Sequence, residues 1–377
     1  MLRLHRLPQR QRILRAAGRS LPFVLLAAGA VADLMGPDVE RFDRLLYAAP
    51  PLAASTWGWR ATTGIGLLTM VVVAFLAGSR DLEVFSEPVA FQAALLLIIT
   101  AASAVSAYLR TTREKQLRTL HLVADAAQRA VLRPMPARLG TIDLHLLYQS
   151  SATGARVGGD FYKALKTPGA VRLILGDVQG KGLEALDAAE VLLGSFRESA
   201  YTAATLPEIA ARLELSMVRF EERDTVAASA HRFATVLLVE IPDDEPVIRV
   251  LSCGHPPPLL QHHGRTVTLA VTSSLPVNLG VAADDAYEVT QTPFEPGDRM
   301  LMYTDGVSET RDPMGEFYPL AERLAQWALV PAEEVAPLLN QDLVRYSGHS
   351  LDDDTSAVLI VRTDRRVSYD TAAGAVS

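Results

Sequence analysis

The chain reads Gly176-Asp177-Val178-Gln179-Gly180-Lys181-Gly182 directly after the apolar run 171–175. The apolar run is typical of a buried β-strand, and the aspartate beside a glycine marks the point where that strand ends. One Asp-Gly stretch alone predicts only a turn. Three further stretches of the same kind follow apolar or β-rich runs elsewhere, at Gly158-Gly159-Asp160, Tyr303-Thr304-Asp305-Gly306 and Asp352-Asp353-Asp354-Thr355.

Aspartates at four strand ends, far apart in the sequence, are expected to gather at one rim of a folded sheet. Hard divalent cations such as Mg²⁺ and Mn²⁺ prefer carboxylate oxygen, backbone carbonyl oxygen and water as ligands. A water shared by two such cations loses a proton near neutral pH and can attack a phosphoryl phosphorus in line. The pattern therefore predicts a two-metal hydrolytic site.

Composition and charge exclude several other classes of protein. The single cysteine, Cys253, excludes a disulfide framework within the chain and fits a reducing, cytoplasmic location for the folded part. The net charge is −7, and Lys and Arg form no long patch in the folded region. Binding of nucleic acid is not expected, because it needs a concentrated basic face.

The first 109 residues are typical of a membrane region. Residues 1–19 carry six arginines and no acidic residue, which predicts a basic cytoplasmic N-terminus. Residues 20–109 contain apolar stretches that favour four membrane spans, of which the second is the weakest. The expected spans are 20–35, 45–59, 61–78 and 88–109.

Basic residues also follow the last span, so both ends of the membrane region are expected in the cytoplasm, which requires an even number of spans. The chain is then a multi-pass protein of the cell membrane with a cytoplasmic catalytic domain. The alternative is that 21–35 is the apolar core of a signal peptide. Two longer apolar stretches and the lack of a clean cleavage site argue against it.

A helical connector is predicted at 110–133, before Pro134. Its apolar residues recur at a spacing of 3-4-3-4, the seam of a coiled coil, which favours a homodimer formed through this helix. The same spacing also fits an amphipathic helix that lies on its own domain, and the sequence leaves both open. The seam residues are Leu117, Leu120, Ala124, Ala127 and Val131.

From 134 to 363 the pattern changes to short β-rich runs that alternate with helices. Strands are predicted at 142–149, 171–175, 233–241, 247–251, 300–303 and 356–361, and helices at 183–200 and 207–222. Hairpin-length loops between strands, with helices in blocks, predict an α+β domain of layered antiparallel sheets flanked by helices. The tail 364–377 is expected to be disordered.

Six blocks of this region resemble, in order, the bacterial SpoIIE/RsbU-like branch of the metal-dependent serine/threonine phosphatases, the protein phosphatase 2C-like (PPM) group. The resemblance implies a four-layer α-β-β-α sandwich, here preceded by an all-α transmembrane region. It covers roughly residues 140 to 363. The blocks are RVGGDFY at 156–162, GDVQGKGLEA at 176–185, FAT at 233–235, CGHPP at 253–257, YTDGVSE at 303–309 and DDDT at 352–355.

The resemblance also implies roles for individual residues around two divalent ions, Mn²⁺ or Mg²⁺. Asp177 would bridge the two ions, and the backbone carbonyl of Val178 would complete one coordination sphere. Asp160 would hold the second ion, largely through water. Asp305 and Asp352 would bind the first ion.

Some positions depart from the family pattern or leave a choice open. The register of Asp-Asp-x-Thr favours Asp352 over Asp353 as the last ligand. Many relatives carry His where this chain has Lys181, whose side chain could face solvent or substrate. In the eukaryotic branch an early arginine holds the substrate phosphate, and Arg156 lies near the corresponding block.

Two other residues are interpreted as structural. Cys253 is expected to be a buried residue at a strand end, because a cysteine phosphatase would need an arginine at position 259, where the chain has Leu259. His255 lies among prolines and is expected to shape a loop near the site rather than to act as a general acid.

The leading function is a membrane-tethered phosphatase that removes phosphate from serine or threonine of a regulatory protein. The resemblance implies a substrate such as an anti-sigma-factor antagonist. The alternative is a pseudophosphatase scaffold that binds a phosphorylated partner without hydrolysing it, although the presence of all four carboxylates argues against it. A receptor whose phosphatase activity is its output is compatible with the first function.

Overall fold

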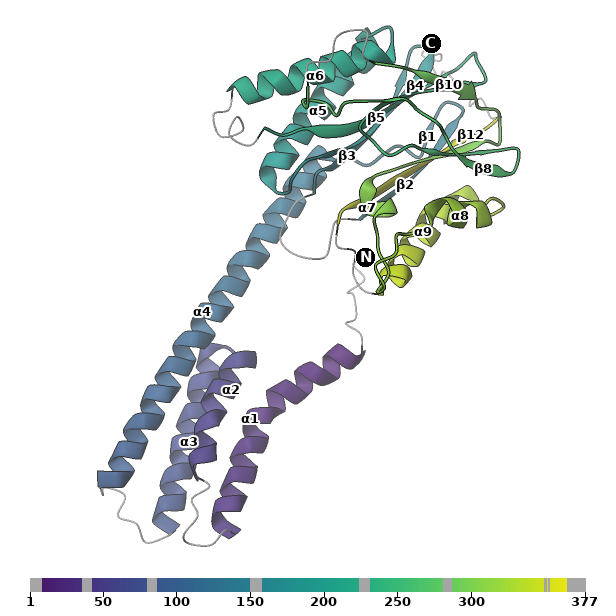
Figure 1. The fold of residues 1–377 in the computed structure, drawn as a ribbon. Helices are drawn as coiled ribbons and strands as arrows, with labels where there is room; N and C mark the ends of the chain where they lie inside the picture. The colour runs from purple at the N-terminus through teal and green to yellow at the C-terminus, as the bar shows by residue number, and fades with distance from the viewer. Residues whose placement is uncertain are drawn as a thin grey trace, which may run out of the picture. The chain divides into compact units, whose positions relative to one another are not determined.

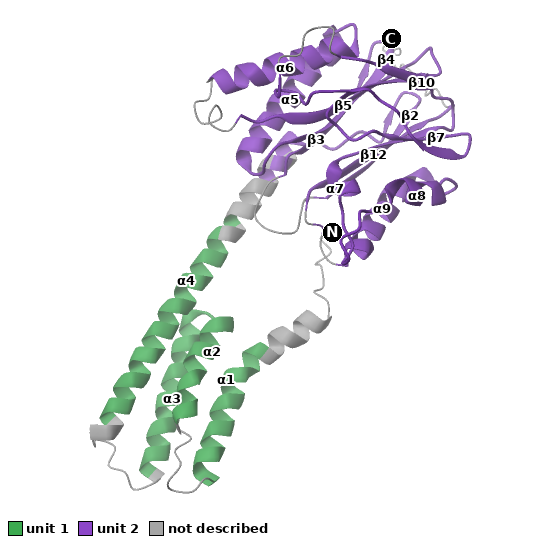
Figure 2. Ribbon diagram, in the orientation of Figure 1, with its two compact units in different colours: residues 1–119 green, residues 120–377 purple. Residues whose placement is uncertain are grey.

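The computed structural model describes residues 9–35, 43–79, 87–149, 158–223, 231–280, 287–348, 351 and 353–364. The chain divides into two compact units, Met1–Thr119 and Leu120–Ser377 (Figure 2). The division falls inside the predicted connector 110–133. Each unit is described by itself below.

In the first unit, every secondary-structure element of the described residues is a helix. Among the described residues, three of its helices contain stretches long and apolar enough to cross a membrane: Gly18–Met35, Trp59–Gly78 and Ala90–Gln116. The segment 45–59, predicted as a weak span, forms two pieces that are each shorter than the ~20 residues a single spanning helix needs. The elements are α1 (Gln9–Met35), η1 (Asp43–Ala48), α2 (Ala49–Thr56), α3 (Trp59–Ser79) and α4 (Glu87–Val131).

The short pieces η1 and α2 pack antiparallel to α1. Gly29 of α1 lies against Leu46 of η1, and Gly18 lies against Thr56 at the end of α2. The guanidinium of Arg110 in α4 donates to the carbonyl oxygen of Trp57 at 2.8 Å. The turn between α2 and α3 therefore lies at the level of Gly18 and Arg110.

Helix α4 continues through the predicted connector as far as Val131. Of the seam residues, the side chains of Leu117, Leu120, Ala124 and Ala127 lie outside the described residues. The coiled-coil prediction therefore stays a prediction.

The second unit contains two sheets. One has the strand order β1-β2-β12-β11-β7-β8, and the other has β10-β6-β5-β4-β3 with β9 beside β6. The six predicted strands lie within β2, β4, β5, β6, β11 and β12 or overlap them. The strands are β1 (Arg138–Leu139), β2 (Ile142–Gln149), β3 (Asp160–Thr167), β4 (Ala170–Val178), β5 (Ala234–Pro242), β6 (Val247–Cys253), β7 (Leu259–His262), β8 (Arg265–Thr268), β9 (Ser273–Ser274), β10 (Thr290–Pro293), β11 (Arg299–Tyr303) and β12 (Thr355–Arg362).

The two sheets stack face to face, and helices cover both outer faces (Figure 1). Helices α5 (Leu183–Thr202) and α6 (Leu206–Arg223) pack on the sheet that contains β3 to β6. Helices α8 (Leu320–Gln326) and α9 (Ala332–Ser347) pack on the sheet that contains β2 and β12. The short helix α7 (Asp305–Ser308) follows β11. The predicted four-layer α-β-β-α sandwich is confirmed.

Strand β12 illustrates why the layers form. All eight of its residues are buried, because both faces of its sheet are covered. Val358 and Ile360 belong to the core between the sheets, whereas Ala357 and Leu359 belong to the core under α9. Successive side chains of a strand point to opposite faces, so an almost continuous apolar run is what this position requires.

Candidate metal centre

Two predicted ligands face each other across a strand pair. Asp160 is the first residue of β3, and Asp177 is the second-last residue of β4. The antiparallel register places Asp160 directly opposite Asp177. Side chains of opposed residues lie on the same face of a sheet within ~5.5 Å of each other, so the ladder itself brings the two carboxylates together.

Gly159 allows a backbone carbonyl to join this pair. A β-carbon at position 159 would lie 2.2 Å from the carbonyl oxygen of Val178 and 2.5 Å from Oδ1 of Asp177. Only glycine leaves room for both oxygens at this point. The Val178 carbonyl and the Asp177 carboxylate, both predicted ligands, therefore converge on the same small space.

The other sheet contributes carboxylates from loops at the same end of the sandwich. Asp305 opens α7 just after β11, and Asp353 and Asp354 precede β12, which pairs with β11. A β-carbon at Gly158 would lie 1.6 Å from Oδ2 of Asp354. The Asp354 side chain, 5% exposed, thus reaches from one sheet to the start of β3 on the other.

Thr304 joins the two sheets at this point. Its hydroxyl Oγ1 donates to Oδ2 of Asp160 at 2.9 Å and accepts from the backbone N–H of Ser356 at 3.1 Å. The Thr304 side chain is fully buried. Sequence reasoning gave Thr304 no role, although the residue lies inside one of the quoted motifs. Its position directly before Asp305 was the only available signal.

The carboxylates act strongly on one another. Burial raises the pKa of Asp177 above its ordinary value, and the negative charges of Asp160 and Asp305 raise it further. Burial is also the main cause of the raised pKa of Asp160 and of Asp305. Lys181 offsets part of this charge, because its Nζ lies 2.5 Å from Oδ1 of the exposed Asp353. When these carboxylates are ionised, the centre therefore has an excess of negative charge that a cation would neutralise.

The available ligands fit a hard divalent cation. They are carboxylate oxygens and one carbonyl oxygen, the set that Mg²⁺ and Mn²⁺ prefer. In the part of the chain that the structure describes, no three His, Cys, Asp or Glu side chains are already arranged to hold a metal ion. Carboxylates that repel one another are not expected to close around an empty point.

The structure brings together most of the predicted site residues. Asp160, Asp177, Val178 and Asp305 lie at one end of the sandwich. Asp352 lies outside the described residues, as does Arg156. Sequence reasoning gave no role to Asp354, which the structure buries beside Gly158.

His255 and Cys253 are both buried. Nδ1 of His255 lies 3.0 Å from Oγ1 of Thr235, and burial lowers the pKa of His255 to about 3, so the ring is neutral. Burial raises the pKa of the Cys253 thiol to about 12, which leaves no thiolate at neutral pH. These features agree with the structural interpretation of both residues.

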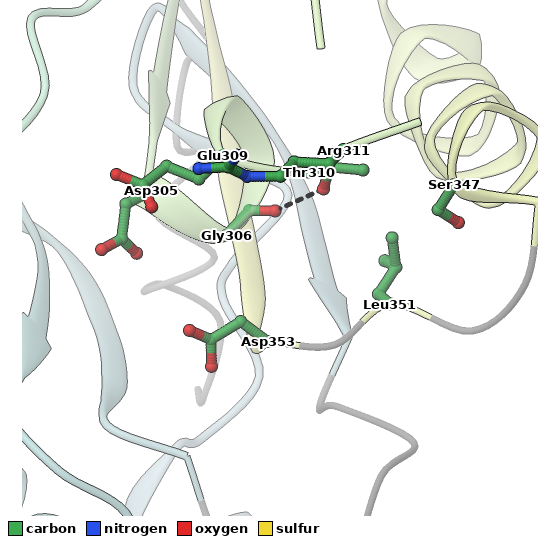
Figure 3. Close-up of a pocket in the computed structure, with 8 residues that line it drawn as sticks. All are labelled: Asp305, Gly306, Glu309, Thr310, Arg311, Ser347, Leu351 and Asp353. Carbon is green, nitrogen blue, oxygen red and sulfur yellow. Dashed lines mark hydrogen bonds between the residues drawn. The ribbon is translucent and has the colours of Figure 1, made fainter. Parts of the chain in front are cut away.

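A cavity of about 250 Å³ opens beside Asp305 and Asp353 (Figure 3). It lies on the side of the centre that Asp305 and Asp353 form, where a substrate could approach. Its other lining residues are Gly306, Glu309, Thr310, Arg311, Ser347 and Leu351.

Comparison with known families agrees with this geometry. The family described as Stage II sporulation protein E (SpoIIE) matches residues 167–364, which is more than half of the chain. The chain belongs to the SpoIIE family. Asp177, Asp305, Asp353 and Asp354 lie inside the matched range, whereas Asp160 lies just before it. The resemblance read from the sequence motifs is confirmed.

Individual relatives are more distant. The phosphoserine phosphatase RsbU of Bacillus subtilis (strain 168) is 22% identical over 214 residues, which cover 56% of this SpoIIE-family chain and 62% of RsbU. The chain thus spans less than two thirds of the length of that relative.

Two solved structures share the fold. The SiaA-PP2C domain of Pseudomonas aeruginosa has a TM-score of 0.56 at 19% identity, over 67% of this chain and 99% of that one. The RsbU and RsbW domains of a Mycobacterium tuberculosis protein have a TM-score of 0.52 at 23% identity, over 62% of this chain and 63% of that one. Both confirm the protein phosphatase 2C-like architecture.

Proposed function

We propose that this chain is a metal-dependent protein serine/threonine phosphatase, a hydrolase. The observation that carries the proposal is the pair Asp160–Asp177, opposed in register at strand ends and joined by Asp305 and Asp354 from the other sheet. The name of the similar RsbU, a phosphoserine phosphatase, supports the same reaction.

The proposed centre holds two divalent ions, Mn²⁺ or Mg²⁺. Asp177 would bridge them, the Val178 carbonyl would complete one sphere, and Asp160 would act largely through water. Asp305 and Asp352 would hold the first ion, with Asp353 as the alternative to Asp352. The Val178 carbonyl and the Asp177 carboxylate converge at Gly159, which supports the roles proposed for these two residues.

In this proposal, the residues of the chain position the reacting groups and do not themselves react. Two bound divalent cations would supply an activated water and offset the charge of the phosphoryl group. Thr304 holds the Asp160 carboxylate by a hydrogen bond, so that its free oxygen can accept from water. Gly158 and Gly159 keep side chains out of the space that the carboxylates share.

Metal dependence is the direct test. The full chain in detergent should hydrolyse a phosphoserine peptide or p-nitrophenyl phosphate only with Mn²⁺ or Mg²⁺, and EDTA should abolish the reaction. Full activity in EDTA would overturn the two-metal proposal. Tight Mn²⁺ binding without hydrolysis of any phosphopeptide would instead favour the pseudophosphatase scaffold.

We further propose that the first unit spans the cell membrane, with the second unit in the cytoplasm. Three apolar helices support this, and η1 with α2 would bring the chain back across as an interrupted fourth pass. The contacts of Gly18 with Thr56 and of Arg110 with Trp57 support an even number of passes, because they set both ends of the region at one level. Reporter fusions at Gly18 and at the C-terminus should lie on the same side; opposite sides would mean three passes.

The proposed substrate is a phosphorylated regulatory protein such as an anti-sigma-factor antagonist. Support comes from the similarity to RsbU, and the membrane unit would bring the reaction to the membrane surface. Dephosphorylation of a purified phosphorylated antagonist at a rate no higher than that of an unrelated phosphoserine peptide would overturn this choice.

We also propose a homodimer through the connector helix, supported by its 3-4-3-4 apolar spacing. Replacing Leu120 and Ala127 with glutamate would put like charges across the seam. Light scattering in detergent should then detect the monomer; an unchanged oligomeric state would return this helix to the role of a spacer.

A further inference from the structure

Arg232 contacts both ends of the bend that follows β4. Its guanidinium Nη1 donates to the carbonyl oxygen of Gln179 at 2.9 Å, and Nη2 donates to the carboxylate of Glu184 in the first turn of α5. The guanidinium therefore bridges the Gly180-Lys181-Gly182 bend from one side to the other. Only 15% of the Arg232 side chain is exposed, whereas its partner Glu184 lies at the surface.

The bend needs such a fixed point. Gly180 and Gly182 have φ angles of 98° and 102°, a region open mainly to glycine, and glycine leaves a backbone free to adopt many conformations. Arg232 lies so close that a β-carbon at Gly180 would come within 2.3 Å of Nη1. The glycine at 180 and the guanidinium thus fit against each other.

Arg232 itself is anchored elsewhere. Its backbone N–H donates to Oε1 of Glu221 in α6 at 2.9 Å, and its carbonyl accepts from the side-chain amide of Asn278 at 2.8 Å. These contacts hold the backbone of Arg232 independently of the bend that its side chain supports. A backbone held by two other segments, with a side chain that spans the bend, is the arrangement expected of a positioning residue.

The peptide that follows Val178 sets the direction of the Val178 carbonyl. In the peptide that joins Val178 to Gln179, the N–H donates to the carbonyl of Phe233 at 2.9 Å. In a trans peptide the carbonyl points away from the N–H, so the Val178 oxygen is directed to the opposite side, where Gly159 lies. Arg232 and Phe233 together hold both polar backbone groups of Gln179.

From this geometry we infer that Arg232 is a positioning residue of the metal centre, which helps to set the Val178 carbonyl at the angle that a divalent cation requires. The inference rests on the proposed metal-dependent function. The Arg232 side chain acts through Gln179 and Glu184, the two residues that accept its hydrogen bonds. Its loss should therefore weaken metal binding and leave the reaction of the fully loaded centre nearly intact.

The test measures Mn²⁺ binding to the full chain in detergent, from the electron paramagnetic resonance signal of free Mn²⁺. Arg232→Gln should weaken binding by about 10- to 100-fold, the range typical of losing a group that orients a ligand. Arg232→Lys should have a smaller effect, because a lysine is a point charge and cannot bridge both acceptors. Arg212→Lys is the matched control, since Arg212 pairs with Glu208 on α6 and makes no contact with the bend.

Kinetics separate positioning from a merely structural role. With saturating Mn²⁺, Arg232→Lys should recover a kcat within about twofold of the parent chain while the Mn²⁺ concentration for half-maximal rate stays raised. Melting in EDTA identifies any variant that does not fold. If Arg232→Gln does not fold, the Mn²⁺ affinities of Arg232→Lys and Glu184→Gln test the inference in its place. Mn²⁺ affinity equal to that of Arg212→Lys in the folded variants would overturn the inference, whatever their melting temperatures.

A failure of the proposed function would look different. Asp177→Ala, measured in the same binding assay, should lose most Mn²⁺ binding. If it binds as tightly as the parent chain, the metal centre itself is wrong and the inference falls with it. If Asp177→Ala loses binding and the Arg232 variants do not, only the inference about Arg232 is wrong.

Discussion

The two halves of the candidate metal centre are built in different ways. Asp160 and Asp177 lie on paired strands, where a continuous ladder fixes their register; Asp160 is buried and Asp177 is partly buried. Asp305 and Asp353 lie on a short helix and a loop beyond the ends of β11 and β12. The first half has its geometry from backbone pairing, whereas the second depends on loops.

This contrast shows which part of the centre can be organised by folding alone: the sheet-borne half (Asp160 and Asp177) rather than the loop-borne half (Asp305 and Asp353). A β-ladder places opposed side chains without help from a ligand. Carboxylates on loops repel one another until a cation offsets their charge. We therefore expect the sheet-borne half to determine whether metal binds at all, and the loop-borne half to determine how many ions bind and how tightly.

The largest effect is expected from Asp177→Ala in the sheet-borne half. A bridging ligand serves both ions, so its loss should lower activity by at least about 100-fold, more than the loss of an orienting group. The hydrolysis rate of p-nitrophenyl phosphate with Mn²⁺ measures it. Asp244→Ala, an exposed aspartate in the turn after β5, is the control. Activity above half of the parent value would contradict the assignment.

Asp305→Ala should have the next largest effect, because it removes a ligand from the loop-borne half alone. The sheet-borne pair would still hold one ion, so the stoichiometry should fall from two Mn²⁺ to one, with an activity loss of at least about tenfold. Equilibrium dialysis measures the stoichiometry. Unchanged stoichiometry would mean that Asp305 lies outside the coordination sphere.

Thr304→Val tests the link between the halves. The change leaves the buried Asp160 oxygen and the Ser356 N–H without their partner, which should cost about 1–3 kcal/mol of the free energy of unfolding. Urea unfolding in EDTA measures the cost, with the exposed Thr268→Val as control. A loss no greater than that of the control would show that the halves do not depend on this hydroxyl.

Cys253→Ser should have the smallest effect, because Cys253 belongs to neither half. A serine in this fully buried position should cost about 1 kcal/mol of stability and leave the activity unchanged. An enzyme as inactive as Asp177→Ala would require a thiol mechanism instead.

Sequence patterns predicted six interior strands and missed the short interior strand β7 and the strands at the sheet edges. Segments 142–149 and 356–361 have the apolar runs that covered sheets require, and both were recognised. Strand β3 lies at the edge of its sheet and carries Lys163 and Lys166 within Asp160–Thr167, so it lacks that signal. Strand β8 also lies at a sheet edge; it is largely exposed and therefore lacks the apolar run as well.

At the site, aspartates beside glycines were enough to predict Asp160, Asp177 and Asp305. Thr304 and Arg232 were not predictable in the same way. Their roles depend on hydrogen bonds to Asp160 and Gln179, residues distant in sequence that only the packing of the two sheets and of α6 brings near. A threonine or an arginine in a loop carries no local pattern that separates such a role from solvent exposure.

The place of β12 in its sheet has a consequence for biosynthesis. This last strand of the described chain inserts between β2, the first long strand, and β11. On the ribosome, β2 must therefore wait for nearly the whole domain to be synthesised before its partner emerges, and pairing between such distant segments is slow. Asp353 and Asp354 directly precede β12, so the same late event completes the acidic cluster. A chain truncated before Thr355 would leave the edges of β2 and β11 open to association, and it would also be unable to assemble the candidate metal centre.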